Sequence, residues 1–177
     1  MQKQHPKFGL IYLLFIATVF LTMSGCSLDL ARQAEDKEQA AALSDELQPN
    51  PDLSPDDVIR IQVEALQYNN TDDQGIEVTF RFASPANQRV TGPLNRFKHL
   101  LKSPDYRPML NHKTAEYGSL EISGDIASQR VTIIQTDGKA TVYLFKLSKQ
   151  SEGPCTGCWM TDSVLFVPTQ KQNLQGA

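Results

Sequence analysis

Two cysteines, Cys155 and Cys158, are the residues whose type and spacing most directly suggest chemistry. Thiols three residues apart can form a disulfide, ligate a metal or carry out thiol–disulfide exchange. A redox active site of this spacing places its first cysteine at a helix N-terminus, where the helix dipole stabilises the thiolate. Here a proline precedes the pair and a strand-like segment follows it. We therefore expect a structural disulfide, with free thiols, metal ligation and redox chemistry as alternatives.

Other side chains that could bind a metal or transfer protons show no defining pattern. A zinc site would need two ligands besides the cysteines, and nothing in the spacing of His99 and His112 marks a site. No motif pairs a pocket carboxylate with a tyrosine donor, as some pocket isomerases do. We predict no catalytic residue, no metal site and no cofactor. The candidate acid–base groups for an enzyme alternative are Tyr68, Tyr106, Glu116, Tyr117 and Asp162.

A basic run between residues 81 and 113 is the second candidate binding feature. Its cations are opposed only by Asp105. They could bind an anionic ligand or an acidic membrane surface, although we favour a solvated face that pairs with the acidic residues of the first helix and the tether. The run comprises Arg81, Arg89, Arg96, Lys98, Lys102, Arg107 and Lys113, of which Arg89, Arg96, Lys98 and Arg107 are the candidate anion-binding residues.

The N-terminus has the pattern of an export signal. Lys3 and Lys7 precede an almost unbroken apolar run over residues 8–23. A membrane-spanning helix needs about 20 apolar residues, so this run is short for a permanent span. A basic start, a short apolar centre and small residues after it are typical of a cleaved secretory leader. We assign residues 1–25 to a signal peptide.

The end of this leader carries a more specific motif. Residues 23–26, Met-Ser-Gly-Cys, resemble the lipobox of bacterial lipoproteins, in which a diacylglyceryl group is attached to the cysteine sulfur and cleavage leaves that cysteine first. Small residues before the cut fit the family pattern, whereas Met23 replaces its usual leucine. The resemblance implies lipidation of Cys26. An uncleaved anchor or an ordinary secretory cut near Ser24 are the alternatives, and both also place the domain outside the cytoplasm. Ser27 resembles the sorting pattern for the outer membrane of a two-membrane bacterium.

Charge and composition narrow the class of partner. The chain has 177 residues and a net charge of −3, with acidic residues in excess up to residue 73 and basic residues in excess after it. Neither part is basic enough to suggest a nucleic-acid partner, and export makes one less plausible. We expect attachment to a membrane through the lipid on Cys26, and a small ligand or partner protein at the folded domain. The oligomeric state is not predicted.

The chain divides into a leader, a tether, one domain and a tail. Residues 26–53 form a tether and linker, rich in helix formers and then broken by Pro49 and Pro51. We place no core residue in the part of the tether before residue 48. The folded domain is expected over residues 54–167, and residues 168–177 are expected to be a disordered tail.

Within the domain, the pattern predicts helices followed by a sheet. Residues 54–57, Ser-Pro-Asp-Asp, are a strong helix start, and Val58, Ile61, Ala65 and Leu66 follow at helical spacing. A short helix follows Gly92-Pro93. Residues 76–82 alternate like a strand, although a helical face is also present. Four strands are expected at residues 114–122, 129–136, 140–147 and 158–167, with a hairpin turn at Asp137-Gly138.

Several groups of residues in this order resemble the bacterial and plant family known as domain of unknown function 4864, over residues 54–167. The resemblance implies a cystatin-like cone, akin to the nuclear-transport-factor-two superfamily, with three helices packed on a curved four-stranded antiparallel sheet. It makes residues 74–83 a helix, against their alternation. The groups are Ala65-Leu66, residues 80–87 (Phe-Arg-Phe-Ala-Ser-Pro-Ala-Asn), Thr91-Gly92-Pro93 with Phe97, Tyr106-Arg107-Pro108, Gln129-Arg130-Val131 and Cys158-Trp159-Met160.

The family resemblance implies no activity, and a fold alone does not choose a function. We therefore expect an α+β domain that acts as a non-enzymatic binding or scaffold module, held by lipid in the cell envelope, on the periplasmic face of the outer membrane if the bacterium has two membranes. The alternatives are a small-pocket acid–base enzyme of the isomerase or dehydratase type, and a thiol redox protein that uses Cys155 and Cys158.

Overall fold

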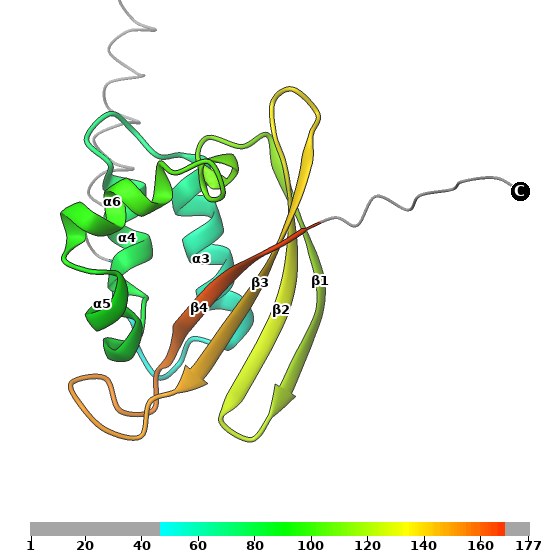
Figure 1. Cartoon of the computed structure of the whole chain (residues 1–177). Helices are drawn as coiled ribbons and strands as arrows, with labels where there is room; N and C mark the ends of the chain where they lie inside the picture. The colour runs from blue at the N-terminus through cyan, green and yellow to red at the C-terminus, as the bar shows by residue number, and fades with distance from the viewer. Residues whose placement is uncertain (1–46, 169–177) are drawn as a thin grey trace, which may run out of the picture. The chain divides into compact units, whose positions relative to one another are not determined.

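The computed structural model of the chain describes residues 47–168. Helices come first and strands afterwards (Figure 1). The helices are α3 (Pro55–Gln67), α4 (Gln74–Arg81), α5 (Pro85–Thr91), α6 (Leu94–Leu101) and a 3-10 turn η1 (Arg107–Met109). The strands are β1 (Thr114–Ser123), β2 (Ile126–Ile134), β3 (Ala140–Lys149) and β4 (Trp159–Val167). The predicted α+β class is confirmed.

The four strands form one antiparallel sheet in the order β1-β2-β3-β4, with each strand beside its neighbours in sequence. The four predicted strands are confirmed, with ends that differ by up to three residues. The β2–β3 hairpin turns at Asp137-Gly138 as expected, because Gly138 takes a positive φ of 84° that other residues adopt only at a cost.

The core lies between the helices and one face of the sheet. Figure 1 shows the helices gathered on that face. Strand β2 alternates accordingly, with Ala127, Gln129, Val131 and Ile133 buried. Apolar side chains of the helices and of the strands are buried against one another, and each contributes about 1.5–3 kcal/mol to holding the two layers together. The largest fully buried side chains from both layers are Tyr143, Phe82, Phe145, Ile59, Leu66, Ile76, Ile133 and Leu147.

Helix α3 begins where the sequence predicts. The Ser54 hydroxyl accepts from the Asp57 N–H at 3.2 Å, and the Asp57 carboxylate accepts from the Ser54 N–H at 2.9 Å. The Ser54 hydroxyl also donates to that carboxylate and holds the pKa of Asp57 below its usual value. The predicted apolar stripe is shifted, since Val58, Ile59, Val63 and Leu66 are buried; of the four predicted residues, Ile61 and Ala65 are only partly buried.

Helix α4 shows that the strand-like alternation of residues 76–82 is misleading. The segment is helical from Gln74 to Arg81, as the family resemblance implied. Its docking on α3 depends on Gly75, because a β-carbon there would lie 1.9 Å from the Ala65 carbonyl oxygen. Helices approach this closely only where one of them lacks a side chain. Packing against α3, rather than local pattern, therefore decides the conformation of this segment.

Helix α5 was not expected. The described residues hold four α-helices, one more than the three predicted. Its start repeats the chemistry of α3, since Ser84 precedes Pro85 and the Ser84 hydroxyl accepts from the Asn87 N–H at 3.2 Å. The Ser-Pro sequence was a sufficient signal for a helix start, but the helix is short and buries none of its residues, so it has no apolar periodicity.

The linker before α3 packs on the domain. Leu47 and Leu53 contact the core, and the Arg81 guanidinium donates to the Leu47 carbonyl at 2.8 Å. The expectation that no core residue lies before residue 48 is therefore wrong for Leu47. Two isolated leucines in a proline-rich segment form no periodic pattern, which is why the sequence did not indicate their burial.

Several predicted features lie outside the described residues. They are the signal peptide at residues 1–25, the lipidation site Cys26, the tether over residues 26–46 and the tail over residues 169–177. Within residues 47–168, no helix is long and apolar enough to span a bilayer.

His112 gives the domain an expected pH dependence. The ring is 4% exposed, its Nδ1 lies 2.8 Å from the Met109 carbonyl oxygen, and its Nε2 is buried without a partner among the described residues. Because the carbonyl can only accept, the proton of the neutral ring sits on Nδ1. Burial lowers the pKa of His112 below its ordinary value of 6.5, so the unfolded chain binds the proton more readily.

We therefore expect His112 to leave the free energy of unfolding at its full value above pH 6.5. Below pH 6.5 the free energy of unfolding should fall, until the pH reaches the lower pKa that His112 has in the folded protein. Urea unfolding of the wild type between pH 7 and pH 5 should show this decrease, and His112→Asn should remove most of it. The control His99→Asn, at an exposed position, should keep the wild-type slope. An unchanged slope in His112→Asn would show that another group is responsible.

Candidate functional site

A small cavity lies between the helices and the sheet. Its volume is about 60 Å³, enough for a few water molecules or one small group and well below the roughly 300–1,000 Å³ of typical ligand pockets. Bulky side chains from both layers leave little empty space. Its apolar wall consists of Leu66, Ala83, Phe97, Leu100, Leu101, Tyr106, Met109, Phe145 and Val164, and its polar part of Gln62, Thr79, Asn87 and Thr161.

The buried side-chain amide of Gln62, in the polar part of this cavity, joins three elements. The Gln62 side chain on α3 donates to the Thr79 carbonyl on α4 at 3.0 Å and accepts from the Thr161 hydroxyl on β4 at 2.6 Å. All three residues are buried. A buried amide needs such partners because leaving it unbonded costs about 1–3 kcal/mol. The arrangement therefore fixes the helices on the sheet, and it carries no charge.

The candidate acid–base groups do not meet in this cavity. Only Tyr106 lines it, and the Tyr106 hydroxyl donates to the Val164 carbonyl at 3.0 Å while burial raises its pKa. Tyr68 and Glu116 are exposed, and Tyr117 lies under the Arg60 guanidinium, 4.2 Å from its ring centre. Asp162 is half-buried and is not part of the lining. The cavity lining, all within the described residues, thus has no carboxylate or imidazole to exchange a proton with a substrate.

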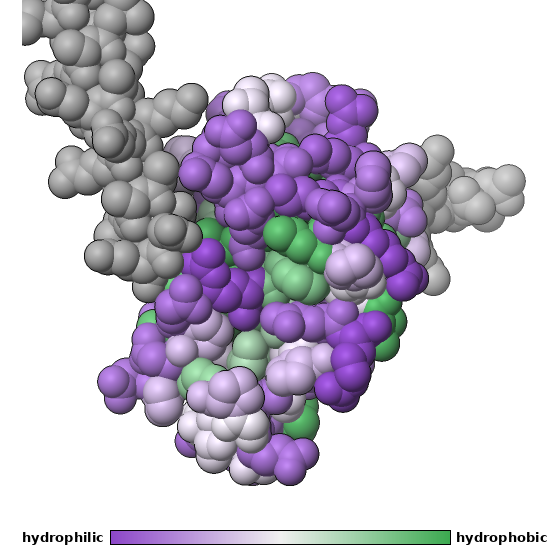
Figure 2. Space-filling model, turned by 90° about the vertical axis from the view of Figure 1, so that its left-hand side faces the viewer, coloured by the Kyte–Doolittle hydropathy of each residue, from purple (hydrophilic) through white to green (hydrophobic). Residues whose placement is uncertain are grey.

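The basic run is divided between ion pairs and isolated surface arginines. Lys98 Nζ lies 2.7 Å from Glu77 Oε1, and Lys102 Nζ lies 2.8 Å from Asp73 Oδ2. The partners are on or beside α4 and not on the first helix or the tether, where we expected them. Arg89, Arg96 and Arg107 are exposed on α5, α6 and η1, and no described contact joins them with Lys98 into one site. Figure 2 shows the helical side, where hydrophilic side chains dominate and a small apolar area lies at the centre.

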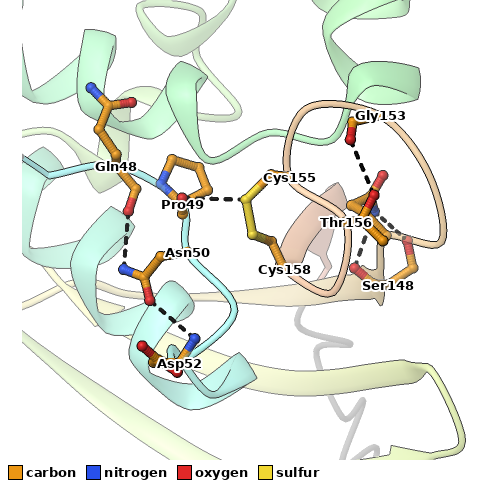
Figure 3. Close-up of a disulfide and its surroundings, with 10 residues drawn as sticks. Gln48, Pro49, Asn50, Asp52, Ser148, Gly153, Cys155, Thr156 and Cys158 are labelled. Carbon is orange, nitrogen blue, oxygen red and sulfur yellow. Dashed lines mark hydrogen bonds between the residues drawn. A yellow bond between two sulfur atoms is a disulfide. The ribbon is translucent and has the colours of Figure 1, made fainter.

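The two cysteines are joined in a disulfide, as the sequence predicts for Cys155 and Cys158. The bond lies in the loop between β3 and β4, and the linker passes beside it (Figure 3). The Cys155 sulfur is 3.3 Å from the Pro49 carbonyl oxygen, and a β-carbon on Gly157 would lie 3.7 Å from the Pro51 side chain. The disulfide loop is thus packed directly against residues 49–51.

A surface groove runs along this contact, and we call it the linker groove. Its volume is about 320 Å³, which is within the range of ligand sites. Three parts of the chain that are distant in sequence build it: the linker, the junction of α4 and α5, and the disulfide loop with the start of β4. Sequence patterns could not indicate such a groove. Its lining residues are Gln48, Pro49, Arg81, Pro85, Gln88, Gln150, Glu152, Pro154, Cys155 and Met160.

The surroundings of the disulfide differ from those of a thiol redox catalyst. Cys155 follows β3 in an irregular loop, and β4 follows Cys158, so no helix N-terminus stabilises a Cys155 thiolate. The nearest polar atom recorded for the sulfur is a carbonyl oxygen, which disfavours negative charge. Among residues 47–168 no group of three potential metal ligands occurs.

Comparison with known families gives a match over residues 50–174, to the family described as "Domain of unknown function (DUF4864)". No curated protein and no solved structure matches the chain. The match contains the resemblance proposed for residues 54–167 and begins within the linker, where the structure also shows packing on the domain. Since it covers more than half of the chain, this protein belongs to the domain of unknown function 4864 family.

Proposed function

We propose that this protein is a lipid-anchored lipoprotein of the cell envelope, and that its domain acts as a non-enzymatic scaffold. The observation that carries the scaffold role is the filled interior between helices and sheet, where a cavity of only about 60 Å³ remains and its lining is uncharged. A domain without an internal ligand site of ordinary size must act through its surface. The proposal of a lipid anchor is supported by the predicted signal peptide and by the motif that ends at Cys26.

The proposed fold is the cystatin-like cone of the nuclear-transport-factor-two superfamily. It is supported by helices that precede a four-stranded antiparallel meander and by their packing on one sheet face. An acid–base enzyme of this fold would need a pocket between the helices and the sheet that holds its substrate. Here Phe97, Tyr106 and Phe145 line a cavity of only about 60 Å³, which favours a scaffold over the acid–base enzyme alternative.

Two matched substitutions measure how much space the interior holds. Val164→Ile adds a methylene at the cavity and should change the free energy of unfolding by less than about 1 kcal/mol, because the group has room. Val131→Ile adds the same methylene at a fully buried β2 position outside the cavity lining and should cost about 1–3 kcal/mol. Urea unfolding of both variants gives the comparison. Equal losses would mean that the cavity is not available to a side chain.

The scaffold role itself is tested by the mass of the protein isolated gently from its own envelope. Native mass spectrometry should show the mature chain without a bound small molecule in its domain, and Val164→Ile should leave that spectrum and the cellular role unchanged. A stoichiometric small-molecule adduct that Val164→Ile removes would contradict the scaffold role and would establish a ligand-binding domain.

A further inference from the structure

The two cysteines of the disulfide differ in burial. Cys155 is half-buried and lines the linker groove, whereas Cys158, just before β4, is 0% exposed. Figure 3 shows the sulfur of Cys155 facing the linker at Pro49. Thiol–disulfide exchange requires an approach to one sulfur of the bond, so access decides which sulfur is attacked. Of the two cysteines, only Cys155 lines the groove, so an attacking thiolate that enters there meets the Cys155 side of the bond.

We propose that Cys155–Cys158 is a thiol–disulfide exchange site, opened at the Cys155 sulfur by a dithiol reductant that enters through the linker groove. The site is a target of reduction and not a redox catalyst. This role goes beyond the proposed scaffold function and does not depend on it, because it follows from the loop and the groove alone.

The fold around the loop does not need the bond. The Gln150 N–H donates to the Cys158 carbonyl at 2.8 Å, and the Gly157 N–H donates to the Gln150 carbonyl at 2.7 Å. These backbone hydrogen bonds close the base of the loop without any contribution from sulfur. The intervening residues 151–154 are exposed, so they can move without uncovering the core. Reduction therefore changes the loop while the sheet stays intact.

Both thiols of the reduced form have suitable surroundings. The Pro49 carbonyl, 3.3 Å from the Cys155 sulfur, can accept a hydrogen bond from the Cys155 thiol once reduction has added a proton. Cys158, fully buried, can remain as a small apolar side chain. The two thiols of the reduced pair are thus accommodated by the groups that already surround them.

The exchange proceeds in two steps with a dithiol as the two-electron donor. One thiolate of the reductant attacks the Cys155 sulfur, a mixed disulfide forms, and the Cys155–Cys158 bond breaks with its electron pair on the Cys158 sulfur, which takes a proton. The second thiolate of the reductant then attacks its own sulfur in the mixed disulfide. Cys155 leaves and is protonated, and the dithiol departs as a disulfide.

The groove has the size and polarity to receive such a reductant on a peptide segment. At about 320 Å³ it has room for a few residues of extended chain. The lining near Cys155 offers the side-chain amides of Gln88 and Gln150, which can bond peptide groups. Both already use their amide nitrogen, Gln88 on the Phe80 and Ala83 carbonyls and Gln150 on Ser148. Their oxygens are thereby held in fixed positions as acceptors.

The test compares two single-cysteine forms of the loop in the full chain, Cys158→Ser and Cys155→Ser, each treated with oxidised glutathione. Peptide mass spectrometry separates residues 155 and 158 from Cys26. In the folded protein Cys155 should form the glutathione mixed disulfide at least about tenfold faster than Cys158. In denaturing urea the two rates should converge. Equal rates in the folded protein, or a faster Cys158, would overturn the proposal.

A second measurement uses the wild-type chain with dithiothreitol as the dithiol. Reduction should proceed at a rate that low urea does not change, and the far-ultraviolet circular dichroism should stay as it is in the oxidised form. If the rate instead rises with urea in parallel with global unfolding, the bond is opened only in the unfolded chain. The bond would then be a permanent structural disulfide, and its role as an exchange site would be excluded.

Discussion

Replacing Gly75 by alanine is expected to destabilise the domain by about 3 kcal/mol or more, enough to leave much of the protein unfolded. The added β-carbon would lie 1.9 Å from the Ala65 carbonyl oxygen and 2.8 Å from the Ala65 carbonyl carbon. Both atoms belong to the backbone of α3, so no side-chain rotation can relieve the overlap. Helix α4 would have to move away from α3, and the buried contacts of Ile76 and Val78 would be weakened.

Gly138→Ala is the matched control for this prediction. Gly138 has a φ of 84°, but no atom lies within 4 Å of a β-carbon placed there. The substitution should therefore cost only the backbone strain, about 1 kcal/mol. Urea unfolding of the wild type and the two variants gives both values. If Gly75→Ala lies within about 1 kcal/mol of the wild type, the close helix contact described here is wrong.

Replacing Cys26 by alanine is expected to abolish the membrane-bound mature form. Without the sulfur no diacylglyceryl group could be attached, and the proposed lipid anchor would be missing. The variant should appear in the soluble envelope fraction or as a longer precursor still held by its leader. Fractionation followed by immunoblotting should show at least about a tenfold loss of membrane-bound mature protein, since two or more acyl chains anchor stably.

Ser24→Ala is the control for the anchor, because it keeps a small residue before the cut and leaves Cys26 in place. It should be processed and sedimented like the wild type. A Cys26→Ala protein of mature size that sediments with the membranes as efficiently as the wild type would contradict lipid anchoring. Attachment would then have to come from another part of the chain.

The sequence predicts those parts of the domain whose structure is decided by neighbouring residues. The start of α3 follows from the reciprocal bonds of Ser54 and Asp57. The strands follow from runs of β-branched and aromatic residues, and their hairpin follows from Asp137-Gly138. The disulfide follows from two cysteines within the domain and their short spacing. In each case a few consecutive residues contain the physical cause.

Features that depend on packing between distant residues could not be predicted in the same way. Residues 76–82 fit a strand by alternation, whereas the structure packs them as a helix against α3, with Gly75 close to the Ala65 carbonyl. The linker groove and the cavity are built from several elements each. The same holds for the pairing of Lys98 with Glu77 across α6 and α4. Composition and spacing contain no information about these distances.

Attachment of the domain to the envelope by a lipid on residue 26 is tested most directly by the mass of the N-terminal peptide of the purified mature protein. We predict a peptide that begins at Cys26 and carries the mass of a diacylglyceryl group, with or without a further acyl chain on its amino group. A peptide in which residue 26 carries an unmodified thiol, or one that begins at another residue, would contradict the anchor.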